Sequence, residues 1–243
     1  WAGSCWYYLR YIDPHNEGAF ADPEKLKQWL PVDKYIGGTE HAVLHLLYAR
    51  FWHKVLFDAG LVSTPEPFNQ LINQGMILGE DGDKMSKSKG NTVAVADVLA
   101  EHGADVFRAY EMFLGAFDKT KAWNTEGING VKRWLERVWS LYEKVDNEAE
   151  MEDAETAEVQ TFIKGVTDDI AAFKFNTAIA KLMVLTNKMM KMDKVPRPLA
   201  EILCKLIAPF APMMTEEIWC TVLGNEFSVH KSEWPQYDET MSA

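Results

Sequence analysis

Long apolar runs, paired cysteines and a secretory leader are all missing from this sequence. None of its hydrophobic segments approaches the roughly 18–20 residues that a membrane-spanning helix needs. The three cysteines, Cys5, Cys204 and Cys220, lie far apart and include no Cys-x-x-Cys pair, which argues against a zinc knuckle or a disulfide framework. The chain starts at Trp1 without an initiator methionine or a basic-then-apolar leader. We therefore expect a cytoplasmic protein that does not bind membranes, and a piece of a longer chain.

Positive charge is scarce as well, because 25 Lys and Arg face 36 Asp and Glu, a formal net charge of −11. Taken alone, this balance argues against a nucleic-acid-binding protein. The charges are segregated, however. Residues 146–158 are rich in Asp and Glu and contain no basic residue, whereas Lys and Arg outnumber acidic residues in 181–205. We therefore expect a local basic face on an acidic protein.

The first half of the chain alternates strand and helix signals. The 243 residues, 47% of them hydrophobic, suffice for a large core and for one or two domains. A short buried strand is predicted at Val32–Ile36, followed by the turn Gly37–Glu40 and a helix that ends near Gly60. That helix is apolar nearly all round, so we expect it to be buried on more than one face. A second strand is predicted at Leu71–Leu78, and ligands of such α/β units sit at the carboxyl ends of the strands.

The second half reads as a bundle of helices. Short helices are predicted at 95–101 and 105–114. Apolar residues then recur at helical spacing in longer segments, at 130–144, 159–173, 177–192, 198–207 and 214–223. Prolines punctuate the last two, and a final short strand is predicted at 227–230. The predicted fold class is α/β plus all-α, with an α/β half-domain over residues 1–118 and an α-helical bundle over 119–243.

A lysine-rich loop lies between these halves. Gly82–Asn91 contains three lysines and two serines bounded by glycines, in the order Asp-Lys-Met-Ser-Lys-Ser-Lys. Mobile positive charge with hydroxyl donors suits a polyphosphate, whose charge grows in a phosphoryl- or nucleotidyl-transfer transition state. The ordinary alternative is a solvated basic loop. The particular order Lys-Met-Ser-Lys-Ser favours the nucleotide interpretation.

Two further groups of residues allow more than one interpretation. His41 and His45 share one helical face, but no third ligand is near and no His-Glu-x-x-His order occurs, so we predict no metal site there. A buried or ligand-facing hydrogen-bonding role fits them better. The aromatic residues of 1–12 form either part of the core or the wall of a small-molecule pocket.

Several motifs occur together in one order along the chain. They are Ser4–Tyr11, Tyr35–Ala42, Leu44–Tyr48, Asn73–Met76, Lys84–Asn91, Trp123-Asn124, Arg133–Trp139, Ala208–Pro212, Glu216–Trp219 and Trp234-Pro235. In this order they resemble the bacterial-type leucyl-tRNA synthetases, a family of class I aminoacyl-tRNA synthetases. The resemblance implies the second half of a Rossmann-like catalytic domain followed by an anticodon-binding helical bundle. The family's His-Ile-Gly-His motif, its editing domain and its C-terminal domain are absent from these residues.

The resemblance also implies a reaction. Leucine and ATP form leucyl-adenylate, with Mg²⁺ accompanying ATP, and the leucine is then transferred to tRNA(Leu) by an enzyme that we expect to be monomeric. Lys84 and Lys87 would be the catalytic cations. The implied ATP-binding residues are Gly38, Glu40, Met76, Lys84, Met85, Ser86, Lys87 and Ser88.

Other residues are implied to bind leucine and tRNA. The leucine pocket would be formed by Ser4, Tyr7, Tyr35 and His45. Arg133 and Arg137, one helical turn apart, would contact tRNA phosphates, although a solvated helix face explains them too. Two alternatives stay open: a sister synthetase for isoleucine, valine or methionine, and a non-catalytic tRNA-binding or folding module. We expect these residues alone not to form leucyl-adenylate.

Overall fold

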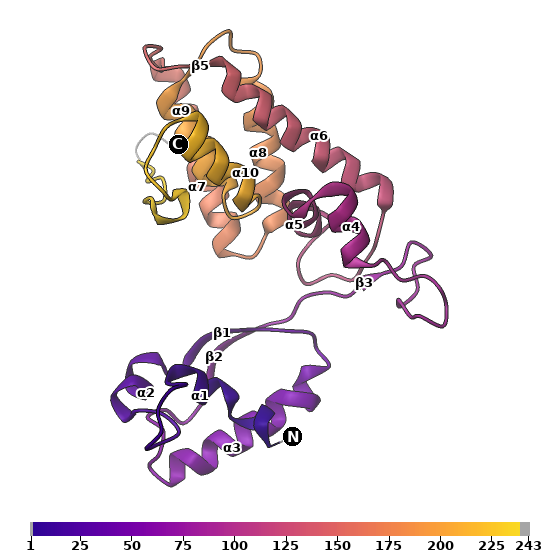
Figure 1. The fold of residues 1–243 in the computed structure, drawn as a ribbon, viewed down its shortest axis with the longest axis vertical. Coiled ribbons are helices and arrows are strands. Elements are labelled where there is room, and N and C mark those ends of the chain that lie inside the picture. The colour runs from indigo at the N-terminus through magenta and orange to yellow at the C-terminus, as the bar shows by residue number, and fades with distance from the viewer. Residues whose placement is uncertain (1, 239–243) are drawn as a thin grey trace. The chain divides into compact units, whose positions relative to one another are not determined.

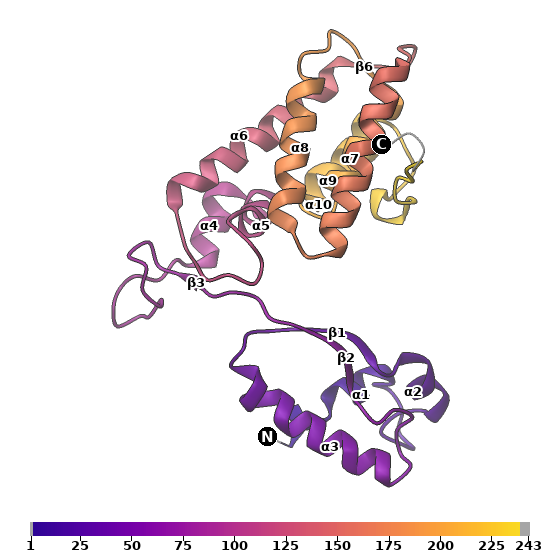
Figure 2. The same ribbon diagram turned by 180° about the vertical axis from the view of Figure 1, so that it is seen from behind.

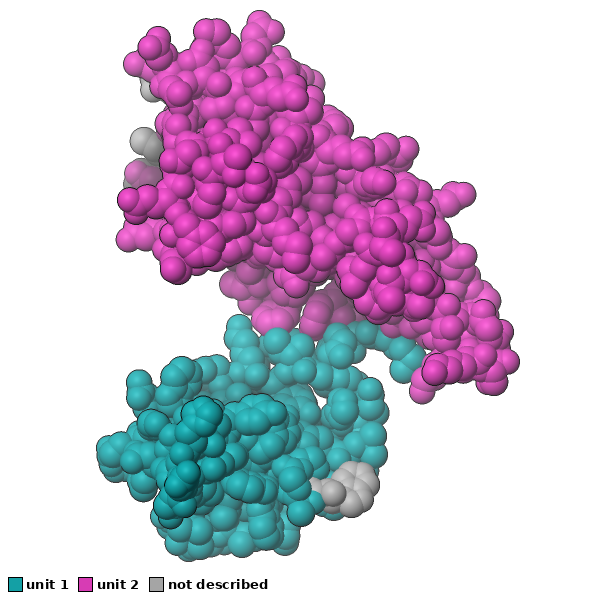
Figure 3. Space-filling model, in the orientation of Figure 1, with its two compact units in different colours: residues 1–76 teal, residues 77–243 magenta. Residues whose placement is uncertain are grey.

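The computed structural model describes residues 2–238, except for the side chains of residues 153–155, and separates the chain into two compact units, Trp1–Met76 and Ile77–Ala243 (Figure 3). Each unit has its own hydrophobic core. Residues 77–118 belong to the second unit by their contacts. The boundary predicted between residues 118 and 119 divides the chain by function, whereas the two units are divided by their contacts. That functional boundary stays a prediction.

The first unit combines short helices with a two-stranded sheet. Its elements are a 3-10 turn at Gly3–Cys5, α1 at Tyr7–Ile12, α2 at Pro23–Trp29, β1 at Val32–Ile36, a π-helical turn at Ala42–Leu46, α3 at Leu47–Asp58 and β2 at Phe68–Ile72 (Figure 1). The strand predicted at Val32–Ile36 is confirmed. The strand predicted at Leu71–Leu78 is wrong in its extent, because β2 ends at Ile72 and a separate strand, β3, covers Ile77–Leu78.

The strands β1 and β2 run parallel. Val32 lies opposite Phe68, and Ile36 lies opposite Ile72. The helix α1 packs onto this pair through Tyr8, whose ring lies 5.2 Å from that of Phe68 and whose hydroxyl lies 2.7 Å from Nδ1 of His53 on α3. One side of the sheet, α1 and α3 therefore share one small core.

The expectation that α3 is buried on more than one face is wrong. Within the described residues, Ala49 and His53 are buried, whereas Val43, Leu47 and Phe51 are 65%, 59% and 67% exposed. The strand β1 is likewise only half covered, since Ile36 is 53% exposed. The reason is that unit 1 packs its helices against one face of the strand pair and offers nothing to the other side of α3.

The second unit is mainly helical. Its elements are β3, α4 at Val95–His102, α5 at Ala104–Phe113, β4 at Lys121–Ala122, α6 at Thr125–Leu141, β5 at Val145–Asp146, α7 at Asp153–Ala171, α8 at Phe175–Met189, β6 at Val195–Pro196, α9 at Arg197–Ile207 and α10 at Pro212–Glu217 (Figures 1 and 2). The predicted bundle is confirmed. None of the helices between residues 2 and 238 has the length and apolar character to cross a bilayer.

Two details of this unit depart from the predictions. The strand predicted at 227–230 is wrong: a 3-10 helix covers Val229–Lys231 instead. Ser228 starts that turn, because its hydroxyl oxygen accepts the His230 amide while its hydroxyl donates to Glu216. The acidic segment 146–158, which charge alone would make an exposed loop between helices, is partly helical, since α7 starts at Asp153.

Buried hydrogen bonds fasten the bundle at several points. The indole of Trp134 on α6 donates to the Thr186 hydroxyl on α8 at 3.1 Å, and the Tyr142 hydroxyl donates to the carbonyl of Ala200 on α9 at 3.0 Å. Both bonds are enclosed by apolar side chains, among them Leu182, which is 0% exposed. Buried donors that find partners fix the register between helices, because leaving one unpaired would cost about 1–3 kcal/mol.

This packing predicts a large difference between two neighbouring positions on α8. Leu182→Ala should lower the free energy of unfolding by about 2–5 kcal/mol, because it leaves a cavity in the bundle core. Val184→Ala, at a side chain that is 47% exposed, should change it by no more than about 0.5 kcal/mol. Urea unfolding followed by far-UV circular dichroism measures both. Equal shifts for the two variants would contradict this packing.

Candidate active site

A cavity of about 540 Å³ opens in unit 1 beside the carboxyl ends of β1 and β2. Side chains from the N-terminal turn, β1, the turn after it and the following helix surround it. The lining residues are Ser4, Tyr7, Tyr35, Ile36, Gly37, Gly38, Glu40, His41, Leu44, His45 and Gln74. This is the edge of a parallel pair at which ligands of α/β proteins bind.

Backbone geometry brings the two strand ends together. After Ile36 the pairing continues by one hydrogen bond, from the Gly37 amide to the Ile72 carbonyl at 3.2 Å. The chain then turns at Gly38, where a Cβ would overlap the carboxylate of Glu40. In this conformation the Glu40 carboxylate folds over the turn and takes the space that a Cβ at residue 38 would need.

His45 is the polar centre of the cavity wall. Its Nε2 lies 2.7 Å from the Ser4 carbonyl, and its Nδ1 lies 2.8 Å from the Tyr35 hydroxyl. A carbonyl oxygen only accepts, so Nε2 carries the proton and the neutral ring accepts from Tyr35 through Nδ1. The ring is buried, being 8% exposed. His45 therefore ties the N-terminal turn to β1, and the lone pairs of the Tyr35 oxygen remain available.

Aromatic rings form much of the remaining wall. The rings of Tyr35 and His45 stack at 5.5 Å, and Tyr7 lies 5.5 Å from His45 on another side. Burial, and secondarily the neighbouring Tyr7, raises the pKa of Tyr35, which keeps its hydroxyl protonated as a donor. An aromatic wall with a carboxylate at its rim suits a ligand with one apolar end and one end rich in hydroxyl donors.

The structure brings together six residues that the sequence singled out. Ser4, Tyr7, Tyr35, Gly38, Glu40 and His45 all line this one cavity. Met76 is not among its lining residues, and its side chain is 43% exposed. Sequence reasoning missed Gln74. Its position two residues after the end of β2 could have indicated it, because it follows a parallel strand at the ligand-binding edge.

The lysine-rich loop connects β3 to α4 in unit 2. Lys89 pairs with Asp83 at 2.8 Å, whereas Lys84 and Lys87 are exposed and have no ion pair within residues 2–238. The hydroxyls of Ser86 and Ser88 lie 3.1 Å apart, and the Ser86 oxygen also accepts the Lys89 amide. Two of the three lysines are thus free to meet an anion.

Met85 points away from the exposed side of the loop. It lines an apolar cavity of about 170 Å³ and is partly buried against the core of unit 2. The other lining residues are Ile77, Val93, Val95, Val98, Phe107, Glu111 and Trp123. In the described structure Met85 anchors the loop, and its contact with ATP stays a prediction.

The expected basic face over residues 181–205 is wrong as stated, because carboxylates neutralise most of it. The ion pairs are Lys181–Asp169, Lys188–Glu158, Lys194–Asp146 and Arg197–Glu201. Arg133 and Arg137 on α6 differ. Both are exposed, and neither forms an ion pair with another residue of the described part. They form the better candidate surface for phosphates.

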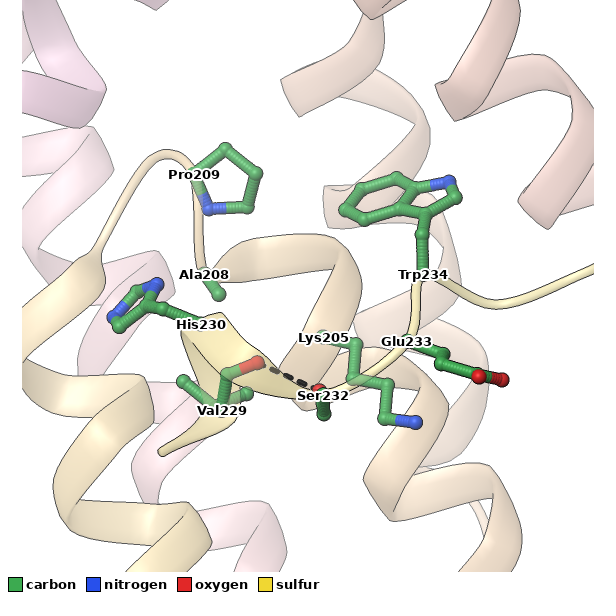
Figure 4. A pocket seen from close by; sticks show the side chains of 8 residues that line it. All are labelled: Lys205, Ala208, Pro209, Val229, His230, Ser232, Glu233 and Trp234. Carbon is green, nitrogen blue, oxygen red and sulfur yellow. Dashed lines mark hydrogen bonds between the residues drawn. The ribbon is translucent and has the colours of Figure 1, made fainter. Parts of the chain in front are cut away.

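A further cavity, of about 180 Å³, lies near the C-terminal end of the bundle (Figure 4). Its polar groups are used within the fold. Ser232 donates to the Val229 carbonyl at 2.6 Å, Trp234 donates to the Thr167 hydroxyl, and the Lys205 ammonium lies over the Trp219 ring. Among the side chains that the structure describes, no three of His, Cys, Asp or Glu cluster as metal ligands would. The unit 1 cavity and the lysine loop therefore remain the principal candidates.

Comparison with known proteins agrees with this geometry. Residues 16–124 match the family of class I tRNA synthetases for I, L, M and V, and residues 156–242 match the anticodon-binding domain of tRNA ligases. A crystal structure of the Agrobacterium radiobacter K84 agnB2 LeuRS–tRNA–LeuAMS ternary complex superposes with a TM-score of 0.87 at 35% sequence identity. The chain belongs to the class I tRNA synthetases. The superposition covers 99% of this chain and 33% of that LeuRS.

The family match covers the site unevenly. The turn at Gly38, the helix that carries His45 and the lysine loop fall within residues 16–124 of this class I synthetase. Ser4 and Tyr7 precede that segment, and Arg133 and Arg137 lie between the two matched segments. These four positions lie outside the family matches and inside the part of the chain that the superposition on LeuRS covers, and their roles stay predictions.

The hydrogen bonds of His45 predict its tautomer. At pH 8 the ¹⁵N spectrum of the imidazole should show a protonated Nε2 and an accepting Nδ1. Tyr35→Phe should remove the donor to Nδ1 and cost about 1 kcal/mol of unfolding free energy, while the proton stays on Nε2, where the Ser4 carbonyl still accepts it. Tyr11→Phe, at a ring that is 73% exposed on α1, is the control. A proton on Nδ1 of the unaltered chain would contradict the assignment.

Proposed function

We propose that this chain is the part of a leucine–tRNA ligase that holds leucine and ATP and presents the helical tRNA-binding bundle. The convergence of Ser4, Tyr35, Gly38, Glu40 and His45 on one cavity is the main support. The likeness to a LeuRS supports leucine over isoleucine, valine or methionine, all of which the family description includes. Because the chain spans about a third of that relative, the activity is proposed for the whole enzyme.

The amino acid would bind against the aromatic wall. An isobutyl group packs well against Tyr7, Tyr35 and Leu44, which all line the cavity. The Tyr35 oxygen donates its proton to His45 and can therefore accept a hydrogen bond from the leucine ammonium. Such a pocket separates side chains that differ by one methylene by only about 1–3 kcal/mol.

The nucleotide would lie over the glycine turn. Gly38 has no Cβ, so adenosine can approach the backbone closely, and the Glu40 carboxylate folded over that turn can accept from ribose hydroxyls. Met76, exposed at the end of unit 1, would lie beside the adenine. In this proposal the carboxyl edge of β1 holds the sugar and the aromatic wall holds the amino acid.

In the first step a carboxylate oxygen of leucine attacks the α-phosphorus of ATP and pyrophosphate leaves. Negative charge then grows on the oxygens of the α-phosphate. The unpaired ammonium groups of Lys84 and Lys87 would stabilise that charge, with Ser86 and Ser88 donating hydrogen bonds. Mg²⁺ would enter with ATP, because the described residues offer no cluster of three metal-ligating side chains.

The second step moves leucine to the terminal ribose of tRNA(Leu). The anticodon-binding domain matched by residues 156–242 supports tRNA as the partner. Arg133 and Arg137 would contact backbone phosphates, since they project one turn apart from the exposed side of α6 without neutralising partners among residues 2–238. Such contacts position the tRNA without reading its sequence.

Leucine-dependent exchange of pyrophosphate into ATP tests the proposal in the longer enzyme that contains this chain. Lys87→Ala should lower the adenylation rate by about 10²–10³-fold and change leucine affinity little, because the charge is needed mainly in the transition state. Lys89→Ala is the matched control in the same loop, and it should lose far less because Lys89 is paired with Asp83.

Three outcomes would contradict the proposal. They are stronger exchange with isoleucine, valine or methionine than with leucine, an unchanged rate in Lys87→Ala, and equal losses in both lysine variants. The chain by itself should show no exchange. Binding of tRNA without any exchange by the longer enzyme would instead support a non-catalytic tRNA-binding module.

A further inference from the structure

The lysine loop has an organising residue that lies outside the Lys-Met-Ser-Lys-Ser order. Asn91 lies just after the lysines and is partly buried, whereas most of its neighbours in the loop are exposed. Its amide oxygen accepts the backbone N–H of Ser86 at 2.9 Å. Its amide nitrogen donates to both carboxylate oxygens of Asp81, at 3.1 and 3.0 Å, and approaches the Lys84 carbonyl at 3.4 Å.

These bonds close the loop into a ring. Asp81 stands before the lysines and Asn91 after them, so the pair joins the two sides of the loop. Asp81 also accepts the Asp83 amide at 3.1 Å, and the Gly79 amide donates to the Asp83 carbonyl at 2.9 Å. Gly79 is buried, and a Cβ there would lie 2.7 Å from Asp81 Oδ1 and 3.0 Å from Asn91 Nδ2. The two ends of the loop are therefore closely packed where Gly79, Asp81 and Asn91 meet, and we call this part the neck of the loop.

One of the three lysines in the ring is ion-paired and, among the described residues, the other two are not. Lys89 is turned back onto Asp83 inside the ring, whereas Lys84 and Lys87 stay exposed without a carboxylate partner in the described part of the chain. An open loop would let all three lysines sample the carboxylates of Asp81 and Asp83. The Asn91 amide engages both oxygens of Asp81, so this carboxylate is held between the two ends of the loop.

We propose that Asn91 is a positioning residue of the proposed nucleotide site. By holding Asp81 and the backbone of Lys84 and Ser86, it keeps the ammonium groups of Lys84 and Lys87 unpaired and in one orientation for a polyphosphate. Met85 supplies the second attachment, because it seats in the apolar cavity beside Phe107 and Trp123. This inference rests on the proposed function only for the identity of the anion.

Exchanging the two partners separates positioning from general damage to the fold. Asn91→Asp keeps an acceptor for the Ser86 amide but sets two carboxylates against each other, so it should open the neck. Asp81→Asn keeps an acceptor for Asn91 and should act weakly. The double variant Asp81→Asn/Asn91→Asp restores a donor–acceptor pair with the direction reversed, and it should rescue the loop. Asp118→Asn, which removes an exposed carboxylate outside the loop, is the control.

Two readouts on the chain itself report the result. The first is amide hydrogen exchange of Ser86, which should speed up about tenfold in Asn91→Asp, as expected for losing a hydrogen-bonded neck, and return to within about twofold in the double variant. The second is an NMR titration with inorganic tripolyphosphate, observed at the Lys84 and Lys87 side chains. Its dissociation constant should rise about fivefold or more in Asn91→Asp and recover in the double variant.

The two readouts distinguish failure of the inference from failure of the proposed function. Ser86 exchange unchanged in Asn91→Asp, or no rescue in the double variant, overturns the role of Asn91 whatever the ligand. If Ser86 exchange changes across the variants as expected but tripolyphosphate causes no shift in the unaltered chain, the result supports the ring and counts against the polyphosphate site. A melting temperature that is equal in all variants shows that the effects belong to the loop.

Discussion

The parallel pairing of β1 with β2 is the constraint on which the candidate site depends. Parallel strands end at the same edge, so the turn after Ile36 and the segment after Ile72 leave the sheet side by side. The bond from Gly37 to the Ile72 carbonyl holds them there. Much of the cavity wall is placed from that edge: the Glu40 carboxylate over Gly38, the helix that carries His45, and Gln74.

A chain of hydrogen bonds makes this edge rigid. The Tyr35 hydroxyl, the His45 ring and the Ser4 carbonyl connect β1, the π-helical turn and the N-terminal 3-10 turn, three segments distant in sequence. The alternative tautomer of His45 would break the chain at Ser4, because a lone pair on Nε2 would then face the carbonyl oxygen. A second histidine, His53, links segments of the core, because its ring is hydrogen-bonded to the Tyr8 hydroxyl and to the Thr64 carbonyl. Burial lowers the pKa of His53. Paired neutral histidines thus hold both the site and its support.

The sequence allowed prediction of features that depend on neighbours along the chain. The strand at Val32–Ile36, the glycine turn, the helical bundle and the six cavity residues all follow local patterns or motif order. The exposure of one side of α3 could not be predicted in this way, because whether Phe51 is buried depends on which other segments pack against it. The pairing of Lys188 with Glu158 could not be read from charge runs, since only the packing of α7 on α8 brings them together. The ring through Asn91 was missed because an asparagine after a glycine reads simply as a turn residue.

Charge distribution completes the account. An acidic chain can still offer cations where acidic neighbours have not neutralised them. The structure distinguishes basic residues that form ion pairs from basic residues that do not. Lys89, Lys188 and Lys194 are paired, while Lys84, Lys87, Arg133 and Arg137 have no ion pair within residues 2–238. Net charge therefore says little about partners here. In the proposed function, these four unpaired cations are the candidate contacts for phosphate.

The most direct test of the central claim is an NMR titration of this chain with a non-hydrolysable leucyl-adenylate analogue. If the β1–β2 edge is the binding site, shifts will concentrate on the amides of Gly37 and Gly38 and on the rings of Tyr35 and His45. Glu40→Gln will weaken the adenosine half of the ligand while sparing contacts of its leucyl half. Shifts confined to the cavity around Lys205 and Trp234, or unchanged spectra at saturating ligand, would contradict the account.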